Sequence, residues 1–433
     1  MLLTTAFSIT RTQFVVIRRA HNYIMKILFI THDIGIYGAA RSLSLHIKSL
    51  LTNDIVKKED IFLLYAKPFL KFTSIKPEML KGLNYKKSIL LPSSRIHKGH
   101  EKSLYNTFKY MVKNIVSIIY CFFYLRLLLK HLKPDLIHLN SLTIWPLLFI
   151  LPKKYKTIIH IREIYNENVN IMTKKLLRKA LLRAYKIIGI DEGVKKALRG
   201  IAKDVEVLRN PFDMENARML RETDRKTLYE RINLSPELKT VALIGRIQPI
   251  KGQSFFIDLA EAYYDKENTL FLVIGTSGNS NYYSLVSEKA KKCANLRILG
   301  GFDEMDVIFP ILDVIVRCED FLPLGRTVFE GYYAGCSVLL PVKEEDDITE
   351  IRQFLNDGIW LYKARNITDI SEKLKQILDS NNSFRNRPSG NLKRYSQEFM
   401  KILGIYGVTT KKQREGQDEH NDITKNQARG LTG

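Results

Sequence analysis

The sequence predicts an α/β protein built from two Rossmann-like domains, each a doubly wound parallel sheet. Two observations carry this prediction. Short apolar runs alternate with amphipathic helical stretches along most of the 433 residues, and strands that are apolar on both faces are typical of a parallel sheet covered by helices. The same alternation restarts after the charged stretch 215–237. Two such sheets in series predict a ligand cleft at the carboxyl ends of their strands.

The predicted strands of the first half are short and apolar. They cover residues 26–31, 61–65, 136–140, 157–161, 186–190 and 205–208. Amphipathic helices are predicted between most of them, for instance at 39–50 and 170–183. Residues 115–125 (IVSIIYCFFYL), flanked by Lys113 and Arg126, fall short of the ~18 to 20 apolar residues that span a bilayer, so we interpret them as a buried helix.

The second half repeats this pattern. Its predicted strands cover residues 240–244, 270–274, 296–299, 313–316 and 337–340, with helices among others at 253–262 and 283–293. We therefore divide the chain into five segments. They are an N-terminal extension that need not be native (1–24), a first domain (25–210), a second domain (211–385), C-terminal helices (386–408) and a polar tail predicted to be disordered (409–433).

The charge predicts an anionic partner. The chain has 68 Lys and Arg against 45 Asp and Glu, a net charge of +23, which favours a phosphorylated ligand, nucleic acid or anionic lipid. No RNP, zinc-finger or helix-turn-helix pattern accompanies the charge, so we expect no nucleic-acid partner. The four cysteines (Cys121, Cys293, Cys318 and Cys336) have no metal-ligand spacing and are too few to staple this chain, which indicates a reducing, cytoplasmic compartment.

Three loops at predicted strand ends carry the candidate site residues. The first, THDIGIYGAARSL at 31–43, contains Gly35, Gly38 and Arg41, and glycines beside free helix-start amides suit an anion. It lacks the GxGxxG pattern and the following acidic residue of a dinucleotide site, which disfavours a dehydrogenase. A tight turn without a ligand is the alternative.

The second loop, LIGRIQPIKGQ at 243–253, follows the first strand of the second domain. Arg246 and Lys251 leave the carboxyl end of that strand, where two cations can neutralise a diphosphate whose charge rises as its ester bond breaks. Solvated surface is the alternative for any basic residue. The position, together with Gly245 and Gly252, favours a functional role.

The third loop, CEDFLPLGRTVFEGYYAGC at 318–336, turns at Gly325 and opens a helix at Arg326 and Thr327. Free amides at a helix start can hold a phosphate, and a carboxylate such as Glu330 can accept two hydrogen bonds from vicinal ribose hydroxyls. The apolar and small neighbours of Glu330 make an unpaired charge there costly, which weakens its interpretation as an ordinary helix residue. Phosphate and ribose together indicate a nucleotide.

These loops belong to an ordered set of segments that resembles glycosyltransferase family 4 over nearly all of residues 25–406. The segments are MKILFITHDIGIYGAARSL, IIHIREI, VLRNPFD, VALIGRIQPIKG and PLGRTVFEGYYAGCSVLLPV, of which the last two are specific. The resemblance implies a GT-B fold with an acceptor domain, a nucleotide-sugar donor domain and a cleft between them. It also implies that the final helices, within 392–406, cross back to the first domain.

The resemblance further implies roles for residues. Arg246 and Lys251 would bind the donor diphosphate and Glu330 the ribose, while the first loop would lie near phosphate and acceptor. His160 would lie near the transferred sugar, although a satisfied core histidine is the alternative. No metal and no cofactor besides the nucleotide-sugar substrate are implied. The reaction would be retaining hexosyl transfer to a glycan or lipid-linked acceptor in polysaccharide or related glycan biosynthesis, driven by positioning and leaving-group stabilisation.

One position departs from the family's pattern. Members show Glu-x7-Glu, and counting back from Glu330 places the first position at Leu322, which cannot hydrogen-bond a sugar. Glu319 and Asp320 come too early in the loop. Three interpretations stay open: a reshaped loop in which one of these acids reaches the sugar, altered donor recognition, or a catalytically impaired protein that binds nucleotide sugars or acts as a partner subunit.

A basic helix adds a candidate partner. Residues 171–189 contain no acid, and their cations share a helix with leucines 176, 177, 181 and 182. The cations are Lys174, Lys175, Arg178, Lys179, Arg183 and Lys186. Such a helix can lie on anionic lipid at ~1 kcal/mol per cation, which would make the protein peripheral at the inner face of the membrane. A core-packed helix with a solvated basic face is the alternative.

Overall fold

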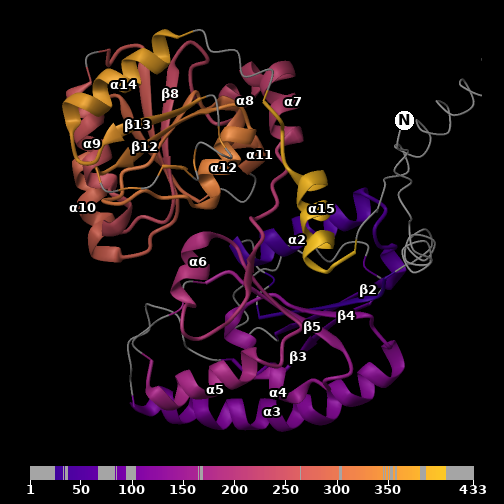
Figure 1. Ribbon diagram of the computed structural model, residues 1–433. Coiled ribbons are helices and arrows are strands. Elements are labelled where there is room, and N and C mark those ends of the chain that lie inside the picture. Colours follow the sequence, from indigo (N-terminus) through magenta and orange to yellow (C-terminus); the bar gives the residue numbers. More distant parts are fainter. Residues whose placement is uncertain are drawn as a thin grey trace, which may run out of the picture. The chain divides into compact units, whose positions relative to one another are not determined.

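The structure is a computed structural model of the chain (Figure 1). It describes residues 25–405 except 33, 35–37, 67–82, 84, 94–103, 164, 166–168, 264, 302–304, 345, 347, 350, 352–354, 356–357 and 381–386, and for 104–111 and 305–306 it describes the backbone alone. The predicted segments 1–24 and 409–433 lie outside the described residues. Two compact units divide the chain: residues 1–211 with 392–433 form the first unit, and residues 212–391 form the second.

The first unit contains a seven-stranded parallel sheet in the order β3-β2-β1-β4-β5-β6-β7. Its strands are β1 (Ile27–Thr31), β2 (Ile61–Ala66), β3 (Tyr85–Ile89), β4 (Leu136–Leu139), β5 (Lys156–Ile161), β6 (Lys186–Gly189) and β7 (Val205–Val207). In the register, Ile27 of β1 pairs with Ile61 of β2 and with Leu136 of β4. The strand order reverses between β1 and β4, and sheets of this kind bind ligands at such a switch point.

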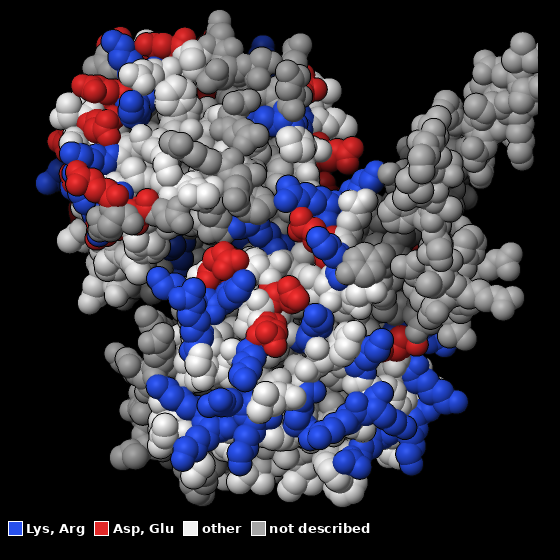
Figure 2. Space-filling view, viewed as in Figure 1, with Lys and Arg blue, Asp and Glu red and all other residues white. Residues whose placement is uncertain are grey.

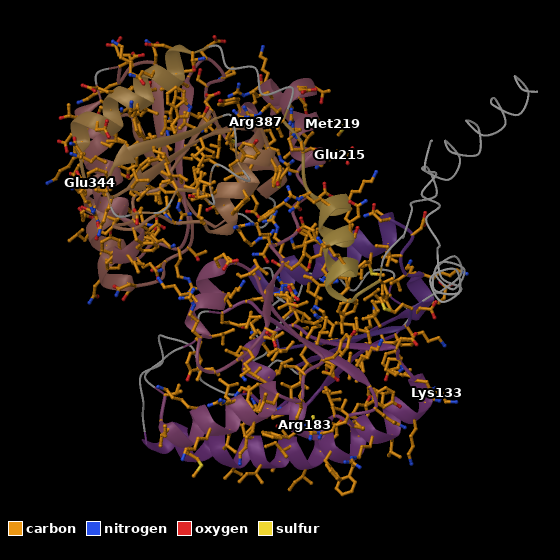
Figure 3. The ribbon with its side chains drawn as sticks, in the orientation of Figure 1. Lys133, Arg183, Glu215, Met219, Glu344 and Arg387 are labelled. Carbon is orange, nitrogen blue, oxygen red and sulfur yellow. The ribbon has the colours of Figure 1, made fainter. Side chains whose placement is uncertain are left out.

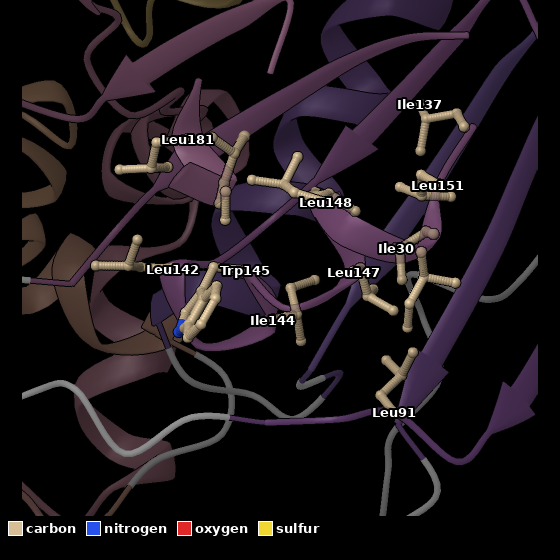
Figure 4. Packing of buried hydrophobic residues seen from close by; sticks show 14 of the residues in the cluster. Ile30, Leu91, Ile137, Leu142, Ile144, Trp145, Leu147, Leu148, Leu151 and Leu181 are labelled. Atoms are coloured by element: carbon tan, nitrogen blue, oxygen red, sulfur yellow. The ribbon is translucent and has the colours of Figure 1, made fainter. Parts of the chain in front are cut away.

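Helices cover both faces of this sheet. One face carries α3 (Leu104–Leu132), α4 (Leu147–Ile150), α5 (Ile171–Leu181) and α6 (Glu192–Ala197), and the other carries α2 (Gly38–Thr52) and α15 (Leu392–Ile402). Successive residues of β1 point to the two layers in turn. Leu28 and Ile30 belong to the core cluster that contains residues of α3 and α4, and Figure 4 shows Ile30 near Leu147 of α4, whereas Ile27 and Phe29 belong to the cluster of α2 and α15. Burial on both sides explains why the strand is apolar at every position.

The second unit repeats the architecture with a six-stranded parallel sheet in the order β10-β9-β8-β11-β12-β13. Its strands are β8 (Lys239–Ile244), β9 (Thr269–Ile274), β10 (Leu296–Leu299), β11 (Val314–Val316), β12 (Ser337–Val342) and β13 (Ile359–Lys363). One face packs against α7 (Glu215–Thr223), α8 (Arg225–Arg231), α11 (Met305–Ile308) and α12 (Arg326–Tyr333); the other packs against α9 (Gln253–Ala262), α10 (Ser280–Ala290) and α14 (Ile367–Asp379). Two Rossmann-like units were predicted, and this prediction is confirmed.

The unit boundaries lie close to the predicted domain boundaries. The chain enters the second unit at Phe212 and returns to the first unit at Leu392, so α15 packs on α2 in the first unit.

The cap residue sets the start of α10. This helix begins at Ser280, three residues before the predicted start, because Asn279 Oδ1 accepts a hydrogen bond from Tyr282 N at 2.9 Å.

The prediction of a buried helix at 115–125 is wrong. Residues 112–132 of α3 are long and apolar enough to cross a membrane by length and composition, with a mean hydropathy of 1.7, and only 22% of that window is buried. Ser117, Cys121, Leu125 and Leu129 form the buried stripe, and the outward stripe is apolar as well. Composition could not separate a helix buried all round from one that shows an apolar face to its surroundings.

Candidate functional site

The carboxyl end of β8 carries the second predicted loop. The chain leaves β8 through Gly245 and Arg246 and passes through the 3-10 turn Pro249–Lys251 before α9 begins. Arg246 is exposed, and its stem runs along Gly278 so closely that an added Cβ there would lie 2.4 Å from Arg246 Cγ. Both predicted diphosphate cations therefore leave the same strand end.

Gly252 fixes where Lys251 points. Its φ is 72°, a conformation that favours glycine, and a Cβ at this position would lie 2.0 Å from the carbonyl oxygen of Cys318. The start of α9 thus touches the backbone just after β11. This contact brings the second and third predicted loops together.

Lys251 reaches a buried carboxylate in the third loop. Its Nζ lies 3.0 Å from Glu319 Oε1, and Arg317 pairs with the same carboxylate through Nη2 and through Nε, which lies 3.2 Å from Oε2. Arg317 Nη1 also donates to Thr327 Oγ1 at 2.5 Å. Lys251, Arg317, Glu319 and Thr327 form one network, which we call the Glu319 network.

Glu319 is ionised, and the cations Arg317 and Lys251 balance its charge. Burial alone would raise the pKa of its carboxyl, but the charges and hydrogen bonds of Arg317 and Lys251 outweigh burial and hold the pKa below its usual value. The side chain is 1% exposed. Two cations against one carboxylate leave the network with a positive charge, which suits an anionic ligand.

The start of α12 presents a second guanidinium. Arg326 donates to Glu330 Oε1 from Nη2 at 2.9 Å and from Nε at 3.1 Å, and its guanidinium carbon lies 4.8 Å from the centre of the Phe212 ring. Phe212 in turn stacks on Phe329 at 5.1 Å. Glu330 is buried and ion-paired, so the charge that looked costly in the sequence has its partner one helical turn away.

The remaining residues of the third loop divide between surface and core. Asp320 is exposed and pairs with Arg365, whose hydrogen bond lowers the pKa of the Asp320 carboxyl. Leu322, at the position where family members carry a glutamate, packs with Leu324 against the core under α12. Neither predicted substitute for that glutamate is unpaired: Glu319 holds Lys251 and Arg317, and Asp320 holds Arg365.

In the first unit, polar side chains meet where β4 and β5 end. Arg162 Nε donates to Asn140 Oδ1 and its Nη1 donates to Asn210 Oδ1, both at 2.7 Å. Glu163 accepts hydrogen bonds from the Ser141 hydroxyl and, at 2.9 Å, from Leu142 N. This group lies at the carboxyl edge of the sheet, beside the switch point between β1 and β4.

His160 lies in the core and has no exposed surface. It joins His46 of α2 and His138 of β4 in a cluster whose candidate ligand nitrogens lie within 4.8 Å of one another. Three imidazoles are a familiar ligand set for zinc, but Arg162 Nη2 lies 3.5 Å from His160 Nδ1 and would repel a cation. Burial first, and the charge of Arg162 next, lower the pKa of His160 and lower that of His138 to about 3, so these rings are neutral. His160 is therefore a core residue, but not a fully satisfied one, because its Nε2 has no hydrogen-bond partner among the described residues, and its role near the sugar stays a prediction.

The first predicted loop is described in part. Gly35 lies outside the described residues; Gly38 is the first residue of α2, and Arg41 lies in its first turn. Thr31, at the end of β1, comes within 3.4 Å of Asn140 Nδ2, which also donates to Ala39 O at 3.2 Å. The start of α2 therefore adjoins the polar group around Arg162.

Comparisons with known proteins agree with this architecture. Residues 224–395 match the family model described as glycosyl transferases group 1. Alr3699/HepE of Anabaena, solved in complex with UDP and glucose, is 15% identical to this chain, with a TM-score of 0.60 over 88% of this chain and 97% of that one. The fold is GT-B. A glycosyltransferase from Rickettsia africae (13% identity, TM-score 0.62, 89% and 95% coverage) and sucrose-phosphate synthase from Thermosynechococcus elongatus (11%, 0.57, 92% and 99%) share this GT-B architecture. No curated protein matches the chain by sequence.

Two arginines of this GT-B chain were missed in the sequence. Arg317 ends the apolar run DVIV, and Arg162 follows the strand TIIHI. A basic residue placed directly at the end of a buried parallel strand was the available signal for both. The predicted resemblance to group 1 glycosyltransferases is confirmed for residues 224–395, and the individual roles of the site residues stay predictions.

Proposed function

We propose that the protein is a glycosyltransferase that moves a sugar from a nucleotide-sugar donor to a glycan or lipid-linked acceptor. The single observation that carries the proposal is the Glu319 network, a positively charged strand end in the segment that matches the group 1 family model. Structural neighbours were solved with UDP and with UDP-glucose. A uridine-diphosphate sugar is therefore the first donor class to test.

In this proposal the second unit holds the donor. Arg246 and Lys251 neutralise the diphosphate as its charge rises during bond cleavage, and the amides at the start of α12, with Gly325, Arg326 and Thr327, support the phosphate. Glu330 accepts hydrogen bonds from the vicinal ribose hydroxyls. These cations supply the charge that a metal would otherwise supply, which is why we propose metal-independent, retaining hexosyl transfer with no further cofactor.

The role of Glu319 in this proposal is to position the cations. A carboxylate that is buried between Arg317 and Lys251 holds the ammonium group at the strand end before the donor arrives. Because the Lys251 side chain is already ordered, binding of a phosphate costs little additional conformational entropy.

A second candidate is a catalytically impaired GT-B protein that binds nucleotide sugars or serves as a partner subunit. The observation that favours it is Leu322, which packs against the core where family members place a carboxylate for the sugar. In either case we propose a cytoplasmic protein, peripheral at the inner face of the membrane, that takes part in polysaccharide or related glycan biosynthesis.

The test begins with Arg246→Ala and Lys251→Ala. Each removes a charge-assisted contact of about 1.5–3 kcal/mol, so we expect calorimetry with UDP to show an affinity about 10- to 150-fold lower. Lys291→Ala and Lys292→Ala, on exposed positions after α10, are the matched controls and should bind as the parent does. Wild-type affinity in both site variants would refute the assignment.

Turnover separates the two candidates. The unmodified protein is incubated with a panel of nucleotide sugars, and release of the nucleoside diphosphate is followed with and without candidate acceptors. Binding with turnover supports the transferase, whereas UDP binding without turnover of any donor supports the impaired protein.

A further inference from the structure

We infer that the outward faces of α3 and α5 form a docking surface for a membrane that contains anionic lipid, with α3 inserted parallel to the bilayer plane. The inference gives the peripheral location proposed above a defined surface, and it depends on no step of sugar transfer. The strongest observation is the outward stripe of α3, which is apolar where a surface helix normally presents polar side chains.

The stripe is well exposed. Ile115, Val116, Ile119, Phe122, Phe123 and Leu127 lie on it, and Ile119, Phe123 and Leu127 are 55%, 63% and 68% exposed. Positions 115, 116, 119, 123 and 127 follow the i, i+3, i+4 spacing of a single helix face. Contiguous exposed apolar surface of this kind marks a contact with a partner or a lipid phase.

Insertion along the surface fits the fold better than a membrane span. The opposite stripe of α3, from Ser117 through Cys121 and Leu125 to Leu129, is buried against the sheet and α4. The helix also leads directly into β4, a central strand of the same sheet. A spanning helix needs lipid or protein around its whole middle section and its ends on opposite sides of the bilayer. In α3, by contrast, one face is exposed and the opposite face is buried from residue 117 to residue 129.

The neighbouring helix extends the surface with apolar and basic residues. α4 packs against both α3 and α5, and these helices belong to the layer that covers one face of the sheet. Ile171 and Met172, at the start of α5, are 68% and 64% exposed. Lys175, Arg178 and Lys179 are exposed on the same helix.

Not every cation of the predicted basic helix is available to lipid. Arg183 donates from Nε to Leu148 O at 2.7 Å and from Nη2 to Leu151 O at 3.3 Å, so it caps the end of α4 (Figure 3). Lys186 pairs with Glu206 at 3.3 Å. The electrostatic part of the surface therefore rests on Lys174, Lys175, Arg178 and Lys179, together with Arg126, whose guanidinium carbon lies 4.1 Å from the centre of the Phe122 ring.

The positive charge of this surface favours anionic lipid as its partner over a second copy of the chain. The sequences of α3, α4 and α5 contain no Asp or Glu, and Lys and Arg gather on the part of the first unit where these helices lie (Figure 2). Two copies that met through this surface would bring like charges together, whereas anionic headgroups complement them while the apolar stripe enters the acyl boundary.

The experiment is flotation of the full chain with vesicles of phosphatidylcholine alone or mixed with phosphatidylglycerol, without nucleotide. We expect binding to the mixed vesicles, and an affinity at least about tenfold lower for the double variant Ile119→Ser/Phe123→Ser. Met219→Ser/Leu285→Ser, which changes exposed apolar residues of α7 and α10 in the second unit (Figure 3 labels Met219), is the matched control and should bind as the parent does. Because donor is absent, failure here leaves the proposed transferase activity untouched.

Two further variants separate insertion from simple electrostatic attraction. Lys175→Gln/Lys179→Gln should weaken binding to mixed vesicles about tenfold, with Lys291→Gln/Lys292→Gln as the control. Phe123→Trp should give indole fluorescence that brominated acyl chains quench more strongly than they quench the parent's tryptophans. The inference is overturned by absence of binding to mixed vesicles, by equal binding to both vesicle types, by absence of quenching, or by a dimer that Ile119→Ser/Phe123→Ser dissociates while vesicles stay unbound.

Discussion

At the scale of single residues, partners decide what each acid of the third loop can do. The carboxylate of Glu319 accepts hydrogen bonds from Lys251 Nζ and from Arg317 Nε and Nη2. We therefore assign Glu319 the role of positioning these two cations, and not that of binding a sugar hydroxyl. The sequence identified Lys251, Glu319 and Thr327 as candidates because each lies near a predicted strand end or helix start. The position of Arg317 at a strand end was an available signal, but its meeting with Lys251 depends on the pairing of β8 with β11, which composition does not encode.

Glu319→Gln tests this assignment. Removing the charge leaves two cations facing a neutral amide in a buried place, and breaking such a pair costs about 3 kcal/mol. We expect urea unfolding to report that loss, and calorimetry to show that UDP and a UDP-sugar lose affinity by the same factor. Asp320→Asn, on an exposed pair with Arg365, should change stability by less than about 1 kcal/mol. Loss of affinity for the UDP-sugar alone would show instead that Glu319 contacts the sugar.

At the scale of elements, the sequence revealed every described strand in the interior of the two sheets, and also the edge strands β7 and β10. Every predicted strand is present, and two further strands among the described residues, β3 (YKKSI) and β13 (IWLYK), lie at the outer edges of their sheets. Edge strands carry charged residues, as Lys86 and Lys87 do in β3, because only part of their surface is covered. The apolar-run signal therefore found the interior strands of the described sheets but only two of their four edge strands.

The junction between β8, α9 and β11 depends on Gly252. Gly252→Ala adds a Cβ 2.0 Å from Cys318 O and forces a φ of 72° on an L-residue. We expect the free energy of unfolding to fall by more than about 1 kcal/mol and UDP affinity to fall with it, because Lys251 moves away from the strand end. Gly300→Ala is the matched control, since an added Cβ there meets nothing within 4 Å. Equal stability and UDP affinity in both variants would contradict this role for the junction.

At the scale of the molecule, the two units differ in how they should respond to acid. The first unit encloses His46, His138 and His160 in one core, and among the groups that the structure describes neither ring nitrogen of His138 has a hydrogen-bond partner. Desolvation lowers the pKa of all three imidazoles, and the nearby charge of Arg162 lowers it further. The chain has two tryptophans, Trp145 in the first unit and Trp360 in the second, so each unit has its own reporter.

Acid should therefore destabilise the first unit before the second. The unfolded chain binds a proton on each of these histidines below about pH 6.5 and the folded unit does not, so stability rises with pH and is lost as pH falls. For His138 the window runs from about 6.5 down to about 3, with a loss of about 1.4 kcal/mol per pH unit for each neutral histidine. Urea unfolding of the Trp360→Phe variant at several pH values, followed by the fluorescence of Trp145, measures how the stability of the first unit changes with pH. The Trp145→Phe variant, followed by the fluorescence of Trp360, gives the same slope for the second unit. His138→Leu removes one titrating group and should reduce the first slope by about 1.4 kcal/mol per pH unit; an unchanged slope would mean that His138 takes up its proton inside the folded unit.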